Sequence, residues 1–98
     1  MTRLEQVRGL ISGHKSALEV RFKVKDLFLF GSYARGQAHR GSDVDILVDF
    51  SGPVGMFTFM ELEDYLKRLL KAKKVDLVSR KALKPYIGKH ILREAVKL

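Results

Sequence analysis

The sequence has no cysteine and no asparagine, and glutamine occurs only at Gln6 and Gln37. The absence of cysteine excludes disulfides, thiolate metal sites and thiol nucleophiles. A shortage of thermolabile side chains is typical of thermophilic proteins, so we expect a thermophilic source.

Long apolar runs are also missing. No stretch approaches the roughly 18 apolar residues of a membrane helix, and residues 1–10 lack the apolar region of a signal peptide. A length of 98 residues corresponds to one domain. We therefore expect a single domain over residues 1–98, cytoplasmic and without membrane association.

Acidic residues are in the minority. The chain has 19 Lys and Arg against 11 Asp and Glu, a formal net charge of +8. Residues 50–98 hold eleven basic and five acidic side chains, whereas residues 1–49 hold eight and six. This excess suits a polyanionic partner such as a nucleotide or nucleic acid, or an acidic protein surface. The solvated surface of a thermostable protein is an equal alternative.

Apolar periodicity predicts alternating helices and strands. Helices are expected up to Gly13, over 14–22, over 57–71 and from Pro85 to Ala95, and strands over 26–30, 43–50 and 74–78. A short helical turn is expected over 32–36, and a loop over 51–55. This order predicts an α/β or α+β fold, in which helices cover a small mixed sheet of three to four strands.

Asp43 and Asp45 stand one residue apart at the start of an apolar run that ends at Phe50. Side chains alternate along a strand, so both carboxylates are expected on one face, about 7 Å apart, and the apolar residues on the other. Paired carboxylates suit Mg²⁺, with Mn²⁺ as an alternative. Leu47 stands where an EF-hand needs another oxygen ligand, which excludes that motif. The other interpretation is a turn followed by a solvent-facing strand residue.

Gly31 and Ser32 follow directly on the first predicted strand. Glycine allows close backbone approach, and the free N–H groups of the short helix expected next point at a bound anion. The Ser32 hydroxyl and the Arg35 guanidinium add donors for phosphate oxygens. A phosphate cradle followed by a dicarboxylate site predicts the binding of a metal-bound nucleoside triphosphate.

The joined pattern, Gly31-Ser32, ten residues, Asp43-x-Asp45, resembles the signature of the nucleotidyltransferase superfamily that includes DNA polymerase beta. The fuller pattern is similar to that of the minimal nucleotidyltransferases, or MNT proteins, of bacteria and archaea. It reads F-G-S-x-A-R-G followed by S-D-x-D-I-L-V. The similarity extends to the V-D-L-V segment at 75–78 and to the closing R-E-A-V at 93–96. The resemblance implies the polymerase beta-like nucleotidyltransferase fold.

The family pattern has a third carboxylate on the following strand, and Asp76 matches it. An unpaired charge inside an apolar strand is costly, so Asp76 also stands out by itself, although an exposed position on an edge strand is an alternative. The resemblance implies that Asp43, Asp45 and Asp76 form a catalytic cluster that holds two metal ions. Asp76 would also accept the proton of the attacking hydroxyl.

MNT proteins often act as antitoxins of HEPN-domain toxins, and the better understood ones transfer AMP from ATP to a tyrosine of the toxin. The resemblance therefore implies a Mg²⁺-dependent nucleotidyltransferase with ATP as substrate, a HEPN-domain toxin as partner, and a homo- or hetero-oligomer. Two alternatives remain open. One is a binding module that masks a toxin without catalysis, and the other is a nucleic-acid-binding domain, although we expect nucleic acid to bind weakly at most.

Four large apolar side chains open the predicted third helix, at Met56, Phe57, Phe59 and Met60. They cover more of the helix circumference than one core stripe needs, so some are expected to be exposed and to bind a partner protein. The alternative is that all four belong to the core.

Overall fold

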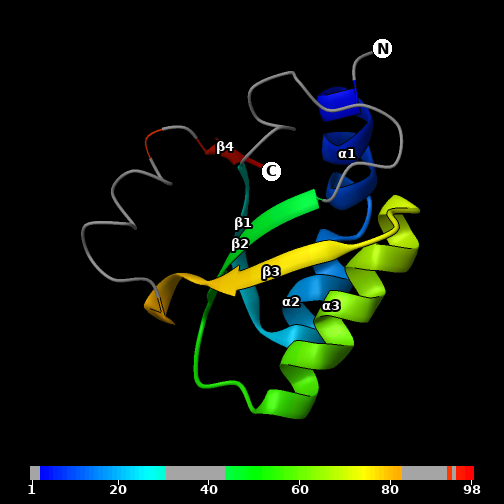
Figure 1. The fold of residues 1–98 in the computed structure, drawn as a ribbon. Coiled ribbons are helices and arrows are strands. Elements are labelled where there is room, and N and C mark those ends of the chain that lie inside the picture. Colours follow the sequence, from blue (N-terminus) through cyan, green and yellow to red (C-terminus); the bar gives the residue numbers. More distant parts are fainter. Residues whose placement is uncertain (1–2, 31–43, 83–92, 94) are drawn as a thin grey trace.

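The computed structural model describes residues 3–30, 44–82, 93 and 95–98 (Figure 1). Four of the predicted site residues, Gly31, Ser32, Arg35 and Asp43, lie outside the described residues. The turn predicted over 32–36 and most of the helix predicted from Pro85 lie outside them as well.

The helices of the described part are α1 (Arg3–Ser12), α2 (Lys15–Phe22) and α3 (Met56–Leu70). Their positions confirm the first three helices predicted from apolar periodicity. In α3, leucines four residues apart at 62, 66 and 70 are buried on one side, as a helix with one core stripe requires. The predicted break at Gly13 is confirmed, since α1 and α2 are separate helices on either side of it.

The strands of the described part form one mixed sheet in the order β3-β2-β1-β4. They are β1 (Val24–Phe30), β2 (Val44–Phe50), β3 (Val75–Ser79) and β4 (Val96–Lys97), with a 3₁₀ turn, η1 (Arg80–Ala82), after β3. β1 is antiparallel to both β2 and β4, whereas β2 and β3 are parallel and are connected through α3. An α+β fold with four strands confirms the predicted class and sheet size.

The C-terminal residues correct one prediction. The helix predicted from Pro85 was expected to include Ala95, but Ala95 lies outside any helix and Val96–Lys97 form β4. Lys97 pairs with Phe28 of β1, and the N–H of Leu98 donates to the carbonyl of Leu27 at 2.8 Å. The free edge of β1 needs hydrogen-bond partners, and this long-range requirement outweighs the local helical pattern.

The core lies between the sheet and the helices. In Figure 1, α1, α2 and α3 lie on the same side of the sheet. The strands supply alternate residues to this core: Leu27, Leu29, Val44, Ile46, Val48, Val75 and Leu77. The residues that alternate with these face the other way, and Asp26, Asp45, Asp49 and Asp76 are among them. None of the helices in the described part of the chain is long and apolar enough to span a membrane.

Candidate active site

Asp45 and Asp76 lie side by side on adjacent strands. Each is the second residue of its strand, and the two are direct Cα partners in the parallel register of β2 and β3. The residues that follow them, Ile46 and Leu77, are buried in the core. Because side chains alternate along a strand, both carboxylates project from the face opposite α1–α3.

The end of β1 lies beside the same point. Phe30, the last residue of β1, is the Cα partner of Asp45 on the other side of β2. Gly31 and Ser32, predicted to bind phosphates, follow Phe30 directly in the sequence. The sheet therefore brings the end of β1 and the starts of β2 and β3 together at the same end of the three strands.

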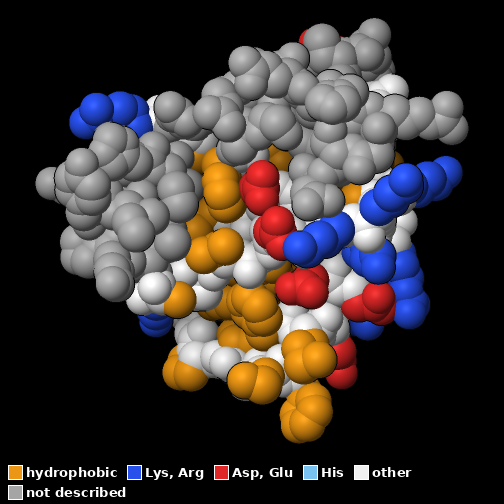
Figure 2. All heavy atoms as spheres, viewed as in Figure 1, with side chains coloured by type: hydrophobic (Ala, Val, Ile, Leu, Met, Phe, Trp, Pro, Cys, Tyr) orange, Lys and Arg blue, Asp and Glu red, His pale blue; other side chains and the backbone are white. Residues whose placement is uncertain are grey.

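Asp76 has a basic partner. The Nζ of Lys74 lies 3.5 Å from the Oδ1 of Asp76, and the two side chains are 64% and 43% exposed. Asp45 is half-buried. Figure 2 shows acidic side chains gathered together with basic side chains directly against them. The site thus contains accessible carboxylate oxygens, of which those of Asp76 are balanced by one ammonium group.

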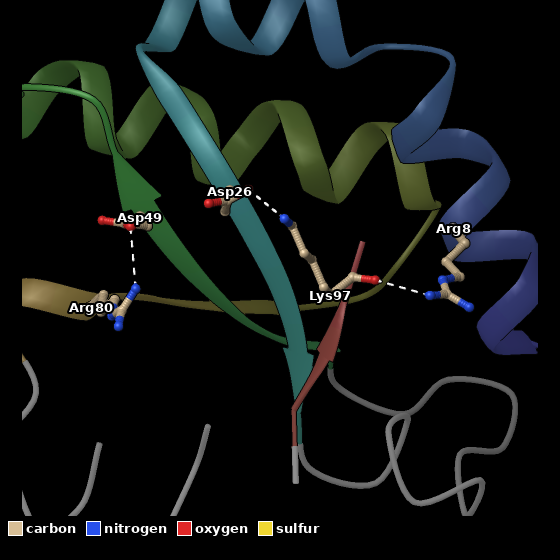
Figure 3. A network of polar contacts seen from close by, with 5 residues as sticks. All are labelled: Arg8, Asp26, Asp49, Arg80 and Lys97. Atoms are coloured by element: carbon tan, nitrogen blue, oxygen red, sulfur yellow. Dashed lines mark hydrogen bonds and ion pairs between the residues drawn. The ribbon is translucent and has the colours of Figure 1, made fainter. Parts of the chain in front are cut away.

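A second acidic pair lies further along the same face. Asp26 of β1 and Asp49 of β2 are Cα partners. The Nη1 of Arg80 lies 3.4 Å from the Oδ2 of Asp49, and the Nζ of Lys97 lies 3.4 Å from the Oδ1 of Asp26 (Figure 3). These carboxylates are therefore engaged in ion pairs that connect η1 and β4 to the central strands.

The same network ties β4 to α1. The guanidinium of Arg8 donates to the backbone carbonyl of Lys97 at 3.3 Å, as Figure 3 shows. Lys97 thus holds Asp26 through its side chain and Arg8 through its backbone. Asp26 and Asp49 therefore have a structural role, since their ion pairs hold β4 and η1 to the central strands.

The described residues bring together two of the three predicted carboxylates. They contain no group of three or more potential metal ligands, and Asp43, which precedes Val44 in the sequence, lies outside them. Lys74 was not among the predicted site residues, although it opens the strand predicted over 74–78. Its position two residues before Asp76 is the signal that could have identified it, since residues i and i+2 of an extended segment face the same way.

Paired carboxylates on adjacent strands fit a hard divalent cation. Mg²⁺ and Mn²⁺ prefer oxygen ligands, and Mg²⁺ usually takes one or two protein carboxylates while keeping waters or phosphate oxygens. Asp45 and Asp76 supply such oxygens from paired positions on adjacent strands. The arrangement can therefore support metal-assisted chemistry on a phosphate compound.

Comparison with protein families gives a match to the nucleotidyltransferase domain over residues 11–98. Among curated proteins, the chain is 47% identical over 96 residues to a protein of Thermococcus cleftensis named protein adenylyltransferase MntA, covering 98% of this chain and 96% of that protein.

Solved structures share the fold. A minimal nucleotidyltransferase structure superposes with a TM-score of 0.82 at 36% identity, covering 100% of this chain and 97% of the other. A toxin–antitoxin structure with AMP-PNP superposes with a TM-score of 0.72 at 26% identity, covering 88% of this chain and 69% of the other.

A further structure is similar in fold alone. It contains a tri-AMPylated HEPN toxin of Shewanella oneidensis in complex with an MNT antitoxin, and the match has a TM-score of 0.66 at 21% identity over 93% of this chain and 70% of the other.

Proposed function

Because the chain belongs to the nucleotidyltransferase domain family, we propose that it transfers AMP from magnesium-bound ATP to a tyrosine hydroxyl of a HEPN-domain toxin and thereby acts as its antitoxin. The observation that carries the proposal is the side-by-side placement of Asp45 and Asp76 next to the end of β1. The adenylyltransferase name of the Thermococcus relative supports AMP as the transferred group.

The residues present fit a divalent cation. Asp45 and Asp76, together with Asp43, would hold Mg²⁺, because carboxylate oxygens are its preferred protein ligands. When bound, the ion neutralises phosphate charge and activates the attacking oxygen.

Each predicted site residue outside the metal site also has a role in the proposed transfer, and Asp76 has a second one. Gly31 and Ser32 bind the phosphates through backbone N–H groups and a hydroxyl, and Arg35 supports them with a fixed positive charge. The tyrosine oxygen forms a bond to the α-phosphorus, the bond to the bridging oxygen breaks, and pyrophosphate leaves. Asp76 accepts the proton that the tyrosine hydroxyl loses.

The transfer is tested by removing one carboxylate at a time. Asp45→Asn and Asp76→Asn should each lower AMP transfer to a co-produced HEPN-domain protein at least about a hundredfold, because both remove charge from the reacting centre. Intact-mass spectrometry of the HEPN-domain protein after incubation with Mg²⁺ and ATP measures the transfer. Calorimetry should show that Asp76→Asn keeps much of its nucleotide binding, since the other ligands remain.

Asp49→Asn is the matched control. Asp49 lies on the same strand and face as Asp45 but is bound to Arg80, so its transfer activity should stay close to that of the parent. Full transfer by Asp45→Asn or Asp76→Asn would remove that residue from the site. Loss of transfer with full neutralisation of the toxin would favour the non-catalytic binding module instead.

A further inference from the structure

Lys74 directly precedes β3, and it contacts Asp76 by its side chain and the strand of Asp45 by its backbone. Its backbone carbonyl accepts a hydrogen bond from the N–H of Val44 at 3.1 Å, which ties it to the strand of Asp45. Its side chain lies on the same face as that of Asp76, with Nζ 3.5 Å from Oδ1. The contact therefore arises from the backbone register together with the two-residue spacing.

Two other basic residues on the described part of this face are engaged elsewhere. Arg80 is bound to Asp49, and Lys97 is bound to Asp26. Within the described residues, Lys74 is the cation that pairs with Asp76.

An ammonium group and a divalent cation compete for the same carboxylate. Lys74 contacts one carboxylate oxygen of Asp76, and a divalent cation held by this carboxylate would be repelled by the nearby Nζ. Both side chains are well exposed, so the ion pair is weak and can be displaced. Lys74 can therefore raise the metal concentration at which the site fills, but it does not prevent metal binding.

We propose that Lys74 is an internal counter-ion of the metal site, which holds Asp76 in the metal-free chain and is displaced when a divalent cation binds. This inference rests on the proposed function, because it takes Asp76 as a metal ligand. Lys74 is a positioning residue, and its effect should appear in metal affinity without any substrate. Displacement also leaves a free ammonium group beside the site, which favours the arrival of a triphosphate anion.

Calorimetric titration of the full chain with MnCl₂, in the absence of nucleotide, tests the proposal. Lys74→Gln should bind Mn²⁺ about two- to tenfold more tightly than the parent, as expected for loss of a weak exposed ion pair and a nearby repulsion. Lys74→Arg should stay close to the parent because it keeps the charge. ATP affinity in the presence of Mg²⁺ should fall in Lys74→Gln, in the opposite direction to the Mn²⁺ affinity.

Lys73→Gln is the matched control, since Lys73 is an exposed neighbour and the change in net charge is the same. Its Mn²⁺ affinity should stay within about twofold of the parent, because it has no ion pair with Asp76. Equal Mn²⁺ affinity in the parent and Lys74→Gln, or an equal gain in Lys73→Gln, would overturn the proposal. If neither the parent nor Lys74→Gln shows Mn²⁺ binding that Asp76→Asn removes, the metal site of the proposed function is wrong, and this inference fails with it.

Discussion

The acidic side chains on the face of the sheet opposite α1–α3 differ in their partners. Asp49 is only 15% exposed and is held by Arg80, whereas Asp76 is 43% exposed and is held by the flexible side chain of Lys74. Burial makes a carboxylate dependent on its partner, because water cannot replace the lost contact. Exposure leaves a carboxylate free to exchange one cation for another, as a binding site requires.

Arg80→Ala should therefore destabilise the fold by about 1–2 kcal/mol, since it leaves Asp49 largely shielded from water without its ion-pair partner. Arg68→Ala is the matched control, because the Arg68–Asp64 pair on α3 is 80% and 54% exposed. Its loss should cost less than about 0.5 kcal/mol. Urea denaturation gives both free energies of unfolding, and an equal or larger effect of Arg68→Ala would contradict the structural role of the Asp49–Arg80 pair.

At the scale of elements, α3 presents two different surfaces. Phe59 packs against the core, and its ring centroid lies 6.3 Å from that of Phe50. Met56, Phe57 and Met60 are 78%, 83% and 59% exposed, so the alternative that all four belong to the core is wrong. Figure 2 shows hydrophobic side chains projecting at the lower end of the molecule. Partner binding by this exposed group stays a prediction.

The two phenylalanines should respond differently to the same change. Phe59→Ser should lower the free energy of unfolding by about 2–3 kcal/mol, because it removes a ring from a packed position. Phe57→Ser should change it by less than about 0.5 kcal/mol, since the ring is exposed in the isolated chain. Thermal and urea unfolding followed by circular dichroism measure both. A large loss of stability in Phe57→Ser would place that ring in a contact that the structure does not describe.

Helices and central strands could be predicted because their signal is local. The leucines of α3 repeat at helical spacing, and the alternation from Val44 to Phe50 assigns Asp45 to the face opposite the core. The contact of Asp45 with Asp76 could not be derived in this way, since alternation gives a face but neither the neighbouring strand nor the register. Family resemblance supplied that information. β4 was missed because two residues are too short to show any periodicity.

At the scale of the whole molecule, the net charge of +8 leaves the nucleic-acid alternative to be tested. On the face that holds the candidate site, Lys74, Arg80 and Lys97 form ion pairs with Asp76, Asp49 and Asp26. The remaining surface charge supports non-specific attraction to polyanions rather than a shaped binding surface.

Duplex DNA should therefore bind more weakly than about 1 μM at physiological salt, and the logarithm of the affinity should fall linearly with the logarithm of salt concentration. Fluorescence anisotropy with a labelled duplex at several salt concentrations measures both quantities. Single-stranded DNA of the same length serves as the comparison, and a similar affinity is expected for it. Sub-micromolar binding at physiological salt would instead favour the nucleic-acid-binding domain.

The order of the strands gives the two halves of the candidate site different mechanical properties. Asp45 stands on β2, which has hydrogen-bonded neighbours on both sides, whereas Asp76 stands on β3, the last strand of the sheet in the described part of the chain. Backbone in the interior of a sheet opens rarely, and an edge strand opens locally at a lower free-energy cost. Asp45 thus stands on stiff backbone, whereas Asp76, the proposed proton acceptor, stands on backbone that can move more easily. Under the proposed function, small movements of β3 would accommodate a protein acceptor, whose tyrosine is attached to a bulky fold, and would leave Asp45 in place.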